Sequence, residues 1–323
     1  MSRTRVGITL ARLLLWAGPA LLAGPAHAVT MDWVPIGNPG NPVDTSTNCV
    51  GPGCGSVGYN YFISKYDVTN AQYAEFLNAK AASDSNSLYS AGMGSDANNG
   101  GITQSGSSGS FTYAVKTGFE NKPVVYVSFW DALRFSNWLN NGQGSADTET
   151  GAYTITATGI LNNTITANRG ATTFLPSENE WYKAAYYNPV TNSYFAYPAG
   201  SNTQTVCALP GATPNTANCG GSVVGKVTDV GAYTGSASPY GMSDAGGNVF
   251  QWNEQIVGSG RGLRGGYWNN GPSFLAASSP NFGDPLDVPF GVGFRVASLV
   301  PEPGTGLLMM TGLLGLATRR RQV

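Results

Sequence analysis

Histidine is almost absent from this chain of 323 residues. The single histidine, His27, lies near the N-terminus, in a segment that we expect to be removed. The remaining chain would then have no histidine side chain at all. This absence excludes a Ser–His–Asp triad, a Cys–His dyad, and any zinc or iron site with histidine ligands. Composition alone therefore argues against several large classes of hydrolase and metalloenzyme.

Charged residues are also scarce, at 11% of the sequence. Three arginines lie near each end, so residues 29–299 hold 17 − 6 = 11 basic side chains. Subtracting Glu302 leaves 18 − 1 = 17 acidic ones, for a net charge near −6. This balance argues against nucleic acid and anionic membrane surfaces as partners.

The first 28 residues have the pattern of a secretory signal peptide. The basic residues at its start are Arg3, Arg5 and Arg12. An apolar run over 13–23 follows, and Ala26-His27-Ala28 fits the small-x-small cleavage rule. The alternative is a buried apolar helix of a cytosolic protein, but charge, length and cleavage site together favour the signal peptide. We therefore expect export, with Val29 as the mature N-terminus.

The last 24 residues have a second targeting pattern. Val300-Pro301-Glu302-Pro303 precedes an apolar run over 304–318, which is shorter than the roughly 20 residues of a spanning helix. Three arginines, residues 319–321, follow at once. Residues 300–323 resemble the PEP-CTERM sorting signal of Gram-negative bacteria. That resemblance implies processing by an exosortase-type membrane protease and a destination at the cell surface, in the extracellular matrix or anchored in the membrane. The alternative is a simple C-terminal anchor.

The chain has four cysteines, which are Cys49, Cys54, Cys207 and Cys219. An exported protein folds in an oxidising compartment, so an even number of cysteines suggests disulfides. Proximity in the sequence favours Cys49–Cys54 and Cys207–Cys219, although three pairings are possible. Metal or redox use is the alternative, but the spacings match no CxxC pattern.

Three segments share one local pattern, a β-rich run followed by a capping box and a short amphipathic helix. The β-rich runs cover residues 59–68, 123–127 and 173–176. The capping boxes are Thr69 with Gln72, Ser128 with Asp131, and Ser177 with Glu180. Each box predicts a helix that begins directly after its Ser or Thr.

The segments between these elements are polar and rich in glycine, of which the chain has 44. We expect an exposed insertion over 83–110 and an inserted hairpin over 148–173. We expect irregular loops over 201–240 and short strands over 261–297. Together these patterns predict one mixed α+β domain over residues 29–299, with few helices, short strands and long loops.

Eight motifs occur in order along this domain. They are Lys65–Asn70 with Tyr73 and Phe76, Pro123–Ser128, Asn137–Leu139, Leu175–Trp181, Tyr240–Met242, Gly247–Trp252, Arg264–Gly266 and Gly293–Arg295. Together they resemble the formylglycine-generating enzyme family, also called sulfatase-modifying factor domains. The resemblance spans residues 31–297 and implies a C-type-lectin-like fold.

Family enzymes oxidise a sulfatase cysteine to formylglycine with copper and oxygen. The resemblance implies copper-binding cysteines four and nine residues after the Gly-Gly pair, and those positions here are Asn270 and Leu275. Tyr267 stands where the family usually has serine, and Ala276 where it usually has arginine. Cu(I) prefers thiolate ligands, so we do not expect copper. The family's iron branch uses histidine ligands, which the mature chain lacks. An active formylglycine-generating oxidoreductase stays the alternative, and it needs a thiolate pair in the cleft.

The resemblance also implies a structural calcium site at the turn before Trp252. The matching ligands would be Asp244, Gly247, Val249 and Gln251. Carboxylate, amide and backbone carbonyl oxygens suit calcium. The alternative is that Asp244 only caps a turn. A second family calcium site would begin near Asn218, and we do not expect it because the neighbouring cysteine is predicted to be bridged.

The same region suggests a recognition surface. Residues 261–272 and 293–295 resemble the ligand-facing end of lectin-fold variable proteins made by diversity-generating retroelements. The residues expected to bind ligand are Tyr267, Asn269 and Asn270, while Trp268 is expected in the core. Aromatic faces and amides suit contact with a glycan or a protein. We therefore predict a non-catalytic module for recognition at a surface or in a matrix.

Glu178 and Glu180 form the one obvious pair of neighbouring carboxylates that could suggest a hydrolase. Residues two apart on a helix point to different faces. The capping box accounts for Glu180, and the helix dipole accounts for an acidic Glu178 in the first turn. The sequence therefore favours a structural role for both.

Overall fold

The computed structural model describes residues 28–46 and 54–299. The helices are α1 (Asn70–Lys80), α2 (Ala91–Ser95), α3 (Phe129–Asn140), α4 (Ala157–Leu161), α5 (Glu178–Tyr186) and the 3-10 helix η1 (Pro272–Leu275). The strands are β1 (Trp33–Ile36), β2 (Tyr61–Ser64), β3 (Ile102–Ser105), β4 (Thr112–Val115), β5 (Thr173–Phe174), β6 (Tyr187–Asn188), β7 (Ser193–Tyr194), β8 (Val206–Cys207), β9 (Thr216–Ala217), β10 (Phe250–Val257), β11 (Gly260–Arg264), β12 (Asn281–Gly283), β13 (Val292–Phe294) and β14 (Ala297–Leu299). Few helices, short strands and long loops give the expected α+β class.

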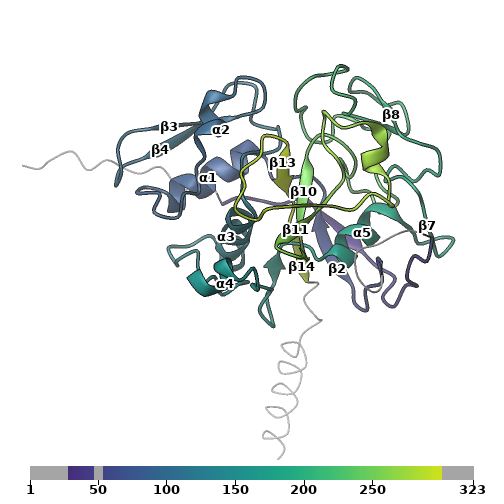
Figure 1. Cartoon of the computed structure of the whole chain (residues 1–323), viewed down its shortest axis with the longest axis horizontal. Helices are drawn as coiled ribbons and strands as arrows, with labels where there is room; N and C mark the ends of the chain where they lie inside the picture. The colour runs from purple at the N-terminus through teal and green to yellow at the C-terminus, as the bar shows by residue number, and fades with distance from the viewer. Residues whose placement is uncertain (1–27, 47–53, 300–323) are drawn as a thin grey trace, which may run out of the picture.

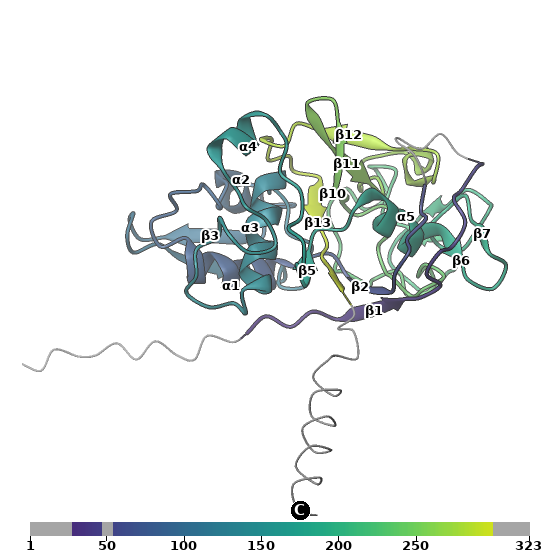
Figure 2. The ribbon, with the colours of Figure 1, turned by 90° about the horizontal axis from the view of Figure 1, so that it is seen from below.

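Two four-stranded sheets form the centre of the described chain, in the orders β1-β2-β14-β5 and β12-β11-β10-β13. Strand β14 pairs antiparallel with β2, with Ala297 opposite Ile63, so the two ends of the domain meet in one sheet. In Figure 1 and Figure 2, α1 and α3 lie on one side of β10 and β13, and α5 lies on the other. The long loops cover the rest.

The three capping boxes are confirmed at α1, α3 and α5. In each, the Ser or Thr hydroxyl accepts the third backbone N–H of the helix. The side chain three residues on in turn accepts the backbone N–H of that Ser or Thr. Two otherwise unpaired N–H groups are thus satisfied at each helix start. The buried stripes of these helices then meet the sheets.

Aromatic residues dominate the core on both sides. Tyr73 and Phe76 of α1 contact Phe135 of α3, and Phe294 of β13 packs against Phe135 with ring centroids 5.3 Å apart. On the other side Trp181 of α5 is fully buried. Large edge-to-face ring pairs bury much apolar area, so they position the loops that cover the sheets.

Two expectations about the loops were wrong. Residues 83–110 are not a wholly exposed insertion, because they form α2 and β3 and bury Leu88, Met93 and Ile102. Residues 148–173 do not form a hairpin. Instead, the Thr156 hydroxyl accepts the Gly159 N–H and caps α4. Local side-chain bonding of this kind overrides the β propensity of alternating Thr and Ile.

The segment 201–240 is irregular apart from the parallel pair β8–β9. It is closed by the predicted Cys207–Cys219 disulfide, with Cα atoms 4.8 Å apart. Cys54 is also disulfide-bonded, while its predicted partner Cys49 lies outside the described residues, as do the predicted signal peptide before residue 28 and the sorting tail. Within the described ranges, no helix is long and apolar enough to cross a membrane.

Candidate functional site

The turn that carries the implied copper positions begins at Gly265 and Gly266, both with positive φ. A left-handed backbone favours glycine, so this pair can turn β11 back toward η1. Leu275 ends that turn fully buried, in a cluster with Ala217 and Cys219. The void beside Leu275 measures about 10 Å³. Such a void holds at most one water molecule.

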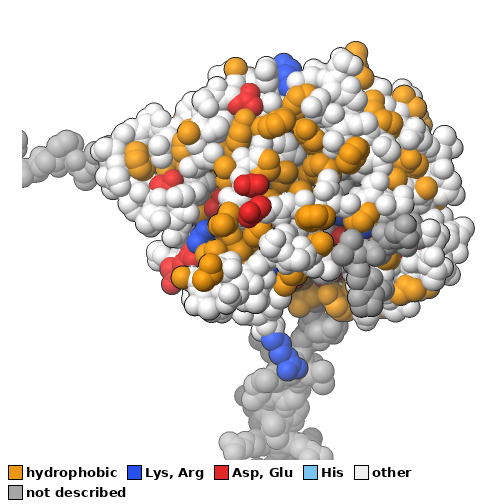
Figure 3. Space-filling model, in the orientation of Figure 1, with side chains coloured by type: hydrophobic (Ala, Val, Ile, Leu, Met, Phe, Trp, Pro, Cys, Tyr) orange, Lys and Arg blue, Asp and Glu red, His pale blue; other side chains and the backbone are white. Residues whose placement is uncertain are grey.

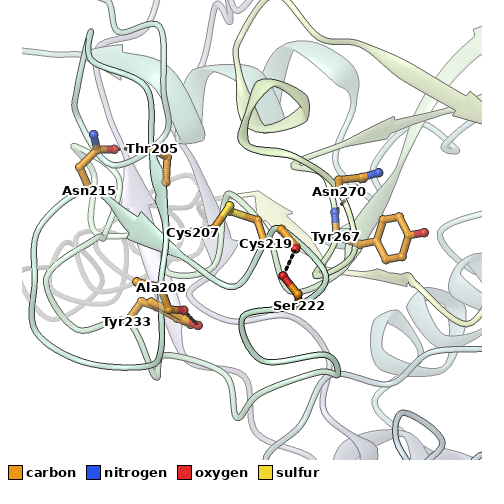
Figure 4. The surroundings of a disulfide bond; sticks show 10 residues. Thr205, Cys207, Ala208, Asn215, Cys219, Ser222, Tyr233, Tyr267 and Asn270 are labelled. Atoms are coloured by element: carbon orange, nitrogen blue, oxygen red, sulfur yellow. Dashed lines mark hydrogen bonds between the residues drawn. A yellow bond between two sulfur atoms is a disulfide. The ribbon is translucent and has the colours of Figure 1, made fainter.

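Asn270 is engaged in holding the turn. Its Oδ1 accepts the backbone N–H of Tyr267 at 3.2 Å. Its carbonyl accepts the backbone N–H of Gly220 at 2.6 Å. Figure 4 shows this turn beside the Cys207–Cys219 disulfide. The amide therefore has a structural task that a cysteine would not perform.

The disulfide is close to the implied copper positions rather than remote from them, since Cys219 and Leu275 share one buried cluster. Bridged sulfur atoms are not thiolates, and Cu(I) needs thiolates. An amide, a leucine and a disulfide do not fit copper.

The predicted recognition residues differ in exposure. Asn269 is exposed, whereas Tyr267 and Trp268 are partly buried. The Tyr267 ring packs against Phe250 and Phe290, with centroids 5.6 and 5.7 Å away. Trp268 packs on a small buried cluster of valines but is not fully enclosed. Asn269 is exposed, while Tyr267 and Asn270 are partly exposed, so the binding role of all three stays a prediction.

Two of the implied calcium ligands, Gln251 and Asp244, form hydrogen bonds within the protein. Oε1 of Gln251 accepts Nε1 of Trp181 and Nε of Arg295, each at 2.6 Å. Its Nε2 donates to the Asp244 carbonyl at 2.8 Å. The Asp244 carboxylate accepts the Gly231 N–H, 13 residues away in the sequence, at 2.6 Å. A glutamine oxygen that already holds two donors, one of them cationic, does not fit a calcium ligand.

Arg295, from the Gly-Phe-Arg motif, holds this region together. Its guanidinium donates to the Ser64 carbonyl at 2.8 Å and the Asp67 carboxylate at 3.0 Å. Both partners of the ion pair are fully buried. Burial raises the pKa of Asp67 to about 8, although Arg295 acts to lower it. The sequence marked Arg295 as a motif residue without indicating this role.

The two neighbouring carboxylates have separate partners. Glu178 forms a buried ion pair with Arg264 and also accepts Nδ2 of Asn253 at 2.9 Å. Glu180 accepts the Ser177 N–H at 2.8 Å, in the capping box, and the Tyr59 hydroxyl at 2.9 Å. They do not face one reacting centre, which agrees with the structural role favoured by the sequence.

One carboxylate that the sequence did not indicate lies in a cleft. Glu254, on β10, accepts a hydrogen bond from the Tyr153 hydroxyl. Burial raises the pKa of Glu254 to about 7. Its partner is 101 residues away in the sequence, so no local pattern could have revealed the pair.

Residues 51–300 match the sulfatase-modifying factor enzyme 1-like domain. The chain belongs to this family. Residues 299–321 match the PEP-CTERM protein-sorting motif, which implies recognition by exosortase-type sorting machinery, and indicates export and membrane anchoring in a Gram-negative bacterium. Family membership also establishes the C-type-lectin-like fold that the motifs implied.

Among curated proteins, the hercynine oxygenase of Mycobacterium tuberculosis is 30% identical over 143 residues, which is 38% of this chain and 32% of the relative. That of Mycolicibacterium smegmatis is 31% identical over 147 residues, with the same coverage. The chain thus spans about a third of the length of these relatives.

Among solved structures, Treponema denticola variable protein 1 aligns with a TM-score of 0.48 and 18% identity, over 84% of this chain and 95% of that one. CarF aligns with a TM-score of 0.49 and 20% identity, over 84% of this chain and 99% of that one.

Proposed function

We propose that this chain is an exported, non-catalytic member of the sulfatase-modifying factor family that serves as a recognition module at the cell surface or in the extracellular matrix. The observation that carries the proposal is that the residues at the two implied copper positions are bound up in packing and hydrogen bonds. Leu275 is buried against Cys219, and Asn270 is committed to the turn. Neither residue can supply a thiolate, and the adjacent void is too small for a peptide.

The recognition surface of this proposal is the turn at residues 267–270 with its aromatic rim. Asn269 offers an exposed amide. Phe290, which is 39% exposed, packs against Tyr267 and Trp268, and Phe274, which is 43% exposed, lies next to Gly266. Exposed aromatic rings next to amides are suited to a glycan or a protein partner. Figure 3 shows hydrophobic side chains across the centre of the visible face, with acidic side chains among them.

The rigidity of this turn supports the same proposal. Gly220 and Gly221 donate their backbone N–H groups to the carbonyls of Asn270 and Trp268, at 2.6 and 2.9 Å. The Cys207–Cys219 disulfide anchors the chain at Cys219, directly before these two donors. A preorganised surface loses less entropy on binding, so a fixed turn favours recognition.

The experiment is a binding assay with purified full-length protein on a glycan array and on outer-surface extracts. The variants are Asn269→Ala and Tyr267→Ala, and the matched control is Asn162→Ala, which changes an exposed asparagine on the C-cap of α4. We expect the wild type and the control to bind equally, and Asn269→Ala to weaken binding at least about tenfold. Absence of binding to every glycan and every extract would remove this proposal.

The alternative function, an active formylglycine-generating oxidoreductase, would need two thiolates at the implied copper positions. The described chain offers only the Cys207–Cys219 pair near Leu275, and these sulfurs are bonded to each other. We therefore favour recognition over oxidation.

A further inference from the structure

A cleft of about 580 Å³ opens at the edge where β2, β5 and β14 lie next to one another, at the start of α5. These elements lie together at the base of the fold in Figure 1. The cleft is separate from the 267–270 turn, because none of the turn's residues lines it. Its volume lies within the range of pockets that bind small ligands.

Glu254 presents one carboxylate oxygen to this cleft. The Oε1 atom accepts the Tyr153 hydroxyl, and the Glu254 backbone N–H donates to the Pro176 carbonyl at 3.1 Å. These two bonds fix the side chain at the cleft wall. Within the described residues Oε2 makes no hydrogen bond, and it is not one of the fully buried polar atoms that lack a partner. The free oxygen is therefore reachable from the cleft.

Glu180 differs from Glu254 because both of its oxygens are used. Oε2 accepts the Ser177 N–H, and Oε1 accepts the Tyr59 hydroxyl at 2.9 Å. Glu180 thus holds the Tyr59 ring at the cleft mouth, where that residue is 47% exposed. An edge contact with Tyr61, at 6.2 Å between centroids, fixes the ring from another side. The cleft therefore has a preorganised aromatic wall.

Two further polar side chains line the cleft without partners of their own. Asn60 and Arg169 are exposed, and neither side chain makes a hydrogen bond or an ion pair with another described residue. Phe174, which is buried, adds apolar surface to the wall. An amide, a guanidinium and a carboxylate oxygen with unused bonding capacity therefore line the same cleft as the Tyr59 ring.

We propose that this cleft binds a neutral polyhydroxylated ligand of one or two sugar rings, which stacks on Tyr59 and is hydrogen-bonded by Glu254, Asn60 and Arg169. A sugar ring has an apolar face that suits an aromatic wall, and hydroxyls that both donate and accept. Carboxylate, amide and guanidinium groups bond pairs of adjacent hydroxyls. A simple anion would be opposed by Glu180 and Glu254, while Arg169 offsets one of these two charges, so the lining does not strongly favour a charged ligand. The proposed binding in this cleft is independent of the proposed recognition at the 267–270 turn.

The test is isothermal titration of the full-length protein with four neutral disaccharides: maltose, cellobiose, lactose and sucrose. The variants are Tyr59→Ala and Glu254→Gln, and the matched control is Glu75→Gln, at an exposed glutamate of α1. Thermal unfolding of each variant shows whether it is folded. We expect at least one disaccharide to bind with a Kd of about 1 mM or tighter, and each cleft variant to weaken it at least about tenfold.

The outcomes are distinct. Binding that is lost in Tyr59→Ala and Glu254→Gln, but kept in Glu75→Gln and Asn269→Ala, supports the cleft. Binding that is lost in Asn269→Ala alone supports the turn instead and overturns the cleft. Absence of binding to all four disaccharides overturns the cleft proposal and leaves recognition at the turn to its own assay. Binding of magnesium or inorganic phosphate in the cleft, without any sugar, also overturns it.

Discussion

The carbonyl of Asn270 accepts the backbone N–H of Gly220 at 2.6 Å, and this bond joins the turn after Gly265 and Gly266 to the segment that directly follows the Cys207–Cys219 disulfide. The region in which family enzymes would hold copper is thus built as a rigid, sealed packing unit. This relationship connects the implied copper positions with the proposed recognition surface, because Asn270 stands at one of these positions and also holds the turn that carries Asn269.

Removal of the disulfide tests how much this unit depends on covalent closure. The bridge joins residues 12 apart, and closing a loop of that size stabilises a protein by about 2–4 kcal/mol. We expect the Cys207→Ala, Cys219→Ala double variant to lose that amount in chemical denaturation, with the Cys54 bridge left intact. If stability is unchanged while binding at the turn is lost, the disulfide has a local rather than a global effect.

The buried ion pair between Glu178 and Arg264 gives a second prediction. Their side chains are 9% and 1% exposed, so Glu178→Gln would leave a guanidinium buried without its counter-charge. Removing one partner of such a pair costs about 3–5 kcal/mol. The control Glu75→Gln, on an exposed face, should stay within about 0.5 kcal/mol of wild type. Equal stability of the two variants in urea unfolding would contradict the structural role of Glu178.

The raised pKa of Glu254 predicts a pH dependence. Burial raises this pKa from 4.5 to about 7, with Glu180 adding to the rise and Tyr153 and Arg261 opposing it. A carboxyl with a raised pKa binds its proton more tightly when folded. Its contribution to stability is therefore complete below pH 4.5 and is lost as the pH rises through about 7.

The difference in thermal midpoint between wild type and Glu254→Gln isolates this group, because other buried carboxyls such as Asp67 and Asp131 are common to both proteins. We expect the wild type to lose stability relative to the variant between pH 4.5 and 7. A difference that is constant across this range would show that Glu254 titrates normally.

Calcium removal gives a fourth prediction. Since Gln251 Oε1 already accepts Trp181 and Arg295, chelation of calcium should change the thermal midpoint by less than about 1 °C. Magnesium in place of calcium serves as the control. A calcium-specific rise of several degrees would restore the predicted ligand set of Asp244, Gly247, Val249 and Gln251, and would require Gln251 to turn away from Arg295.

What the sequence could predict depended on distance along the chain. The bonds of each capping box join residues three apart, so Thr69, Ser128 and Ser177 marked their helices directly. The family motifs likewise indicated the fold. In contrast, Arg295 reaches Asp67 across 228 residues, and nothing local to either residue predicts that bond.

The two wrong loop predictions also arose because contacts within the fold, rather than local sequence patterns, decide the structure there. Residues 154–165 alternate in a way that favours strands, but one hydroxyl on Thr156 caps a helix there. Met93 and Ile102 are isolated in a polar segment, and only the fold places them in the core. The cleft depends on Tyr59, Arg169 and Glu254, which come from three distant segments.

The measurement that tests the central claim most directly combines Cu(I) titration with turnover. The full-length protein is titrated with Cu(I) without oxygen against a competing chelator, then supplied with oxygen and a cysteine-containing sulfatase peptide, and the peptide is analysed by mass spectrometry. A family enzyme that has both copper cysteines is the positive control. We predict no stoichiometric Cu(I) binding and no conversion of the peptide cysteine to formylglycine. One bound Cu(I) per chain together with formylglycine formation would contradict the account.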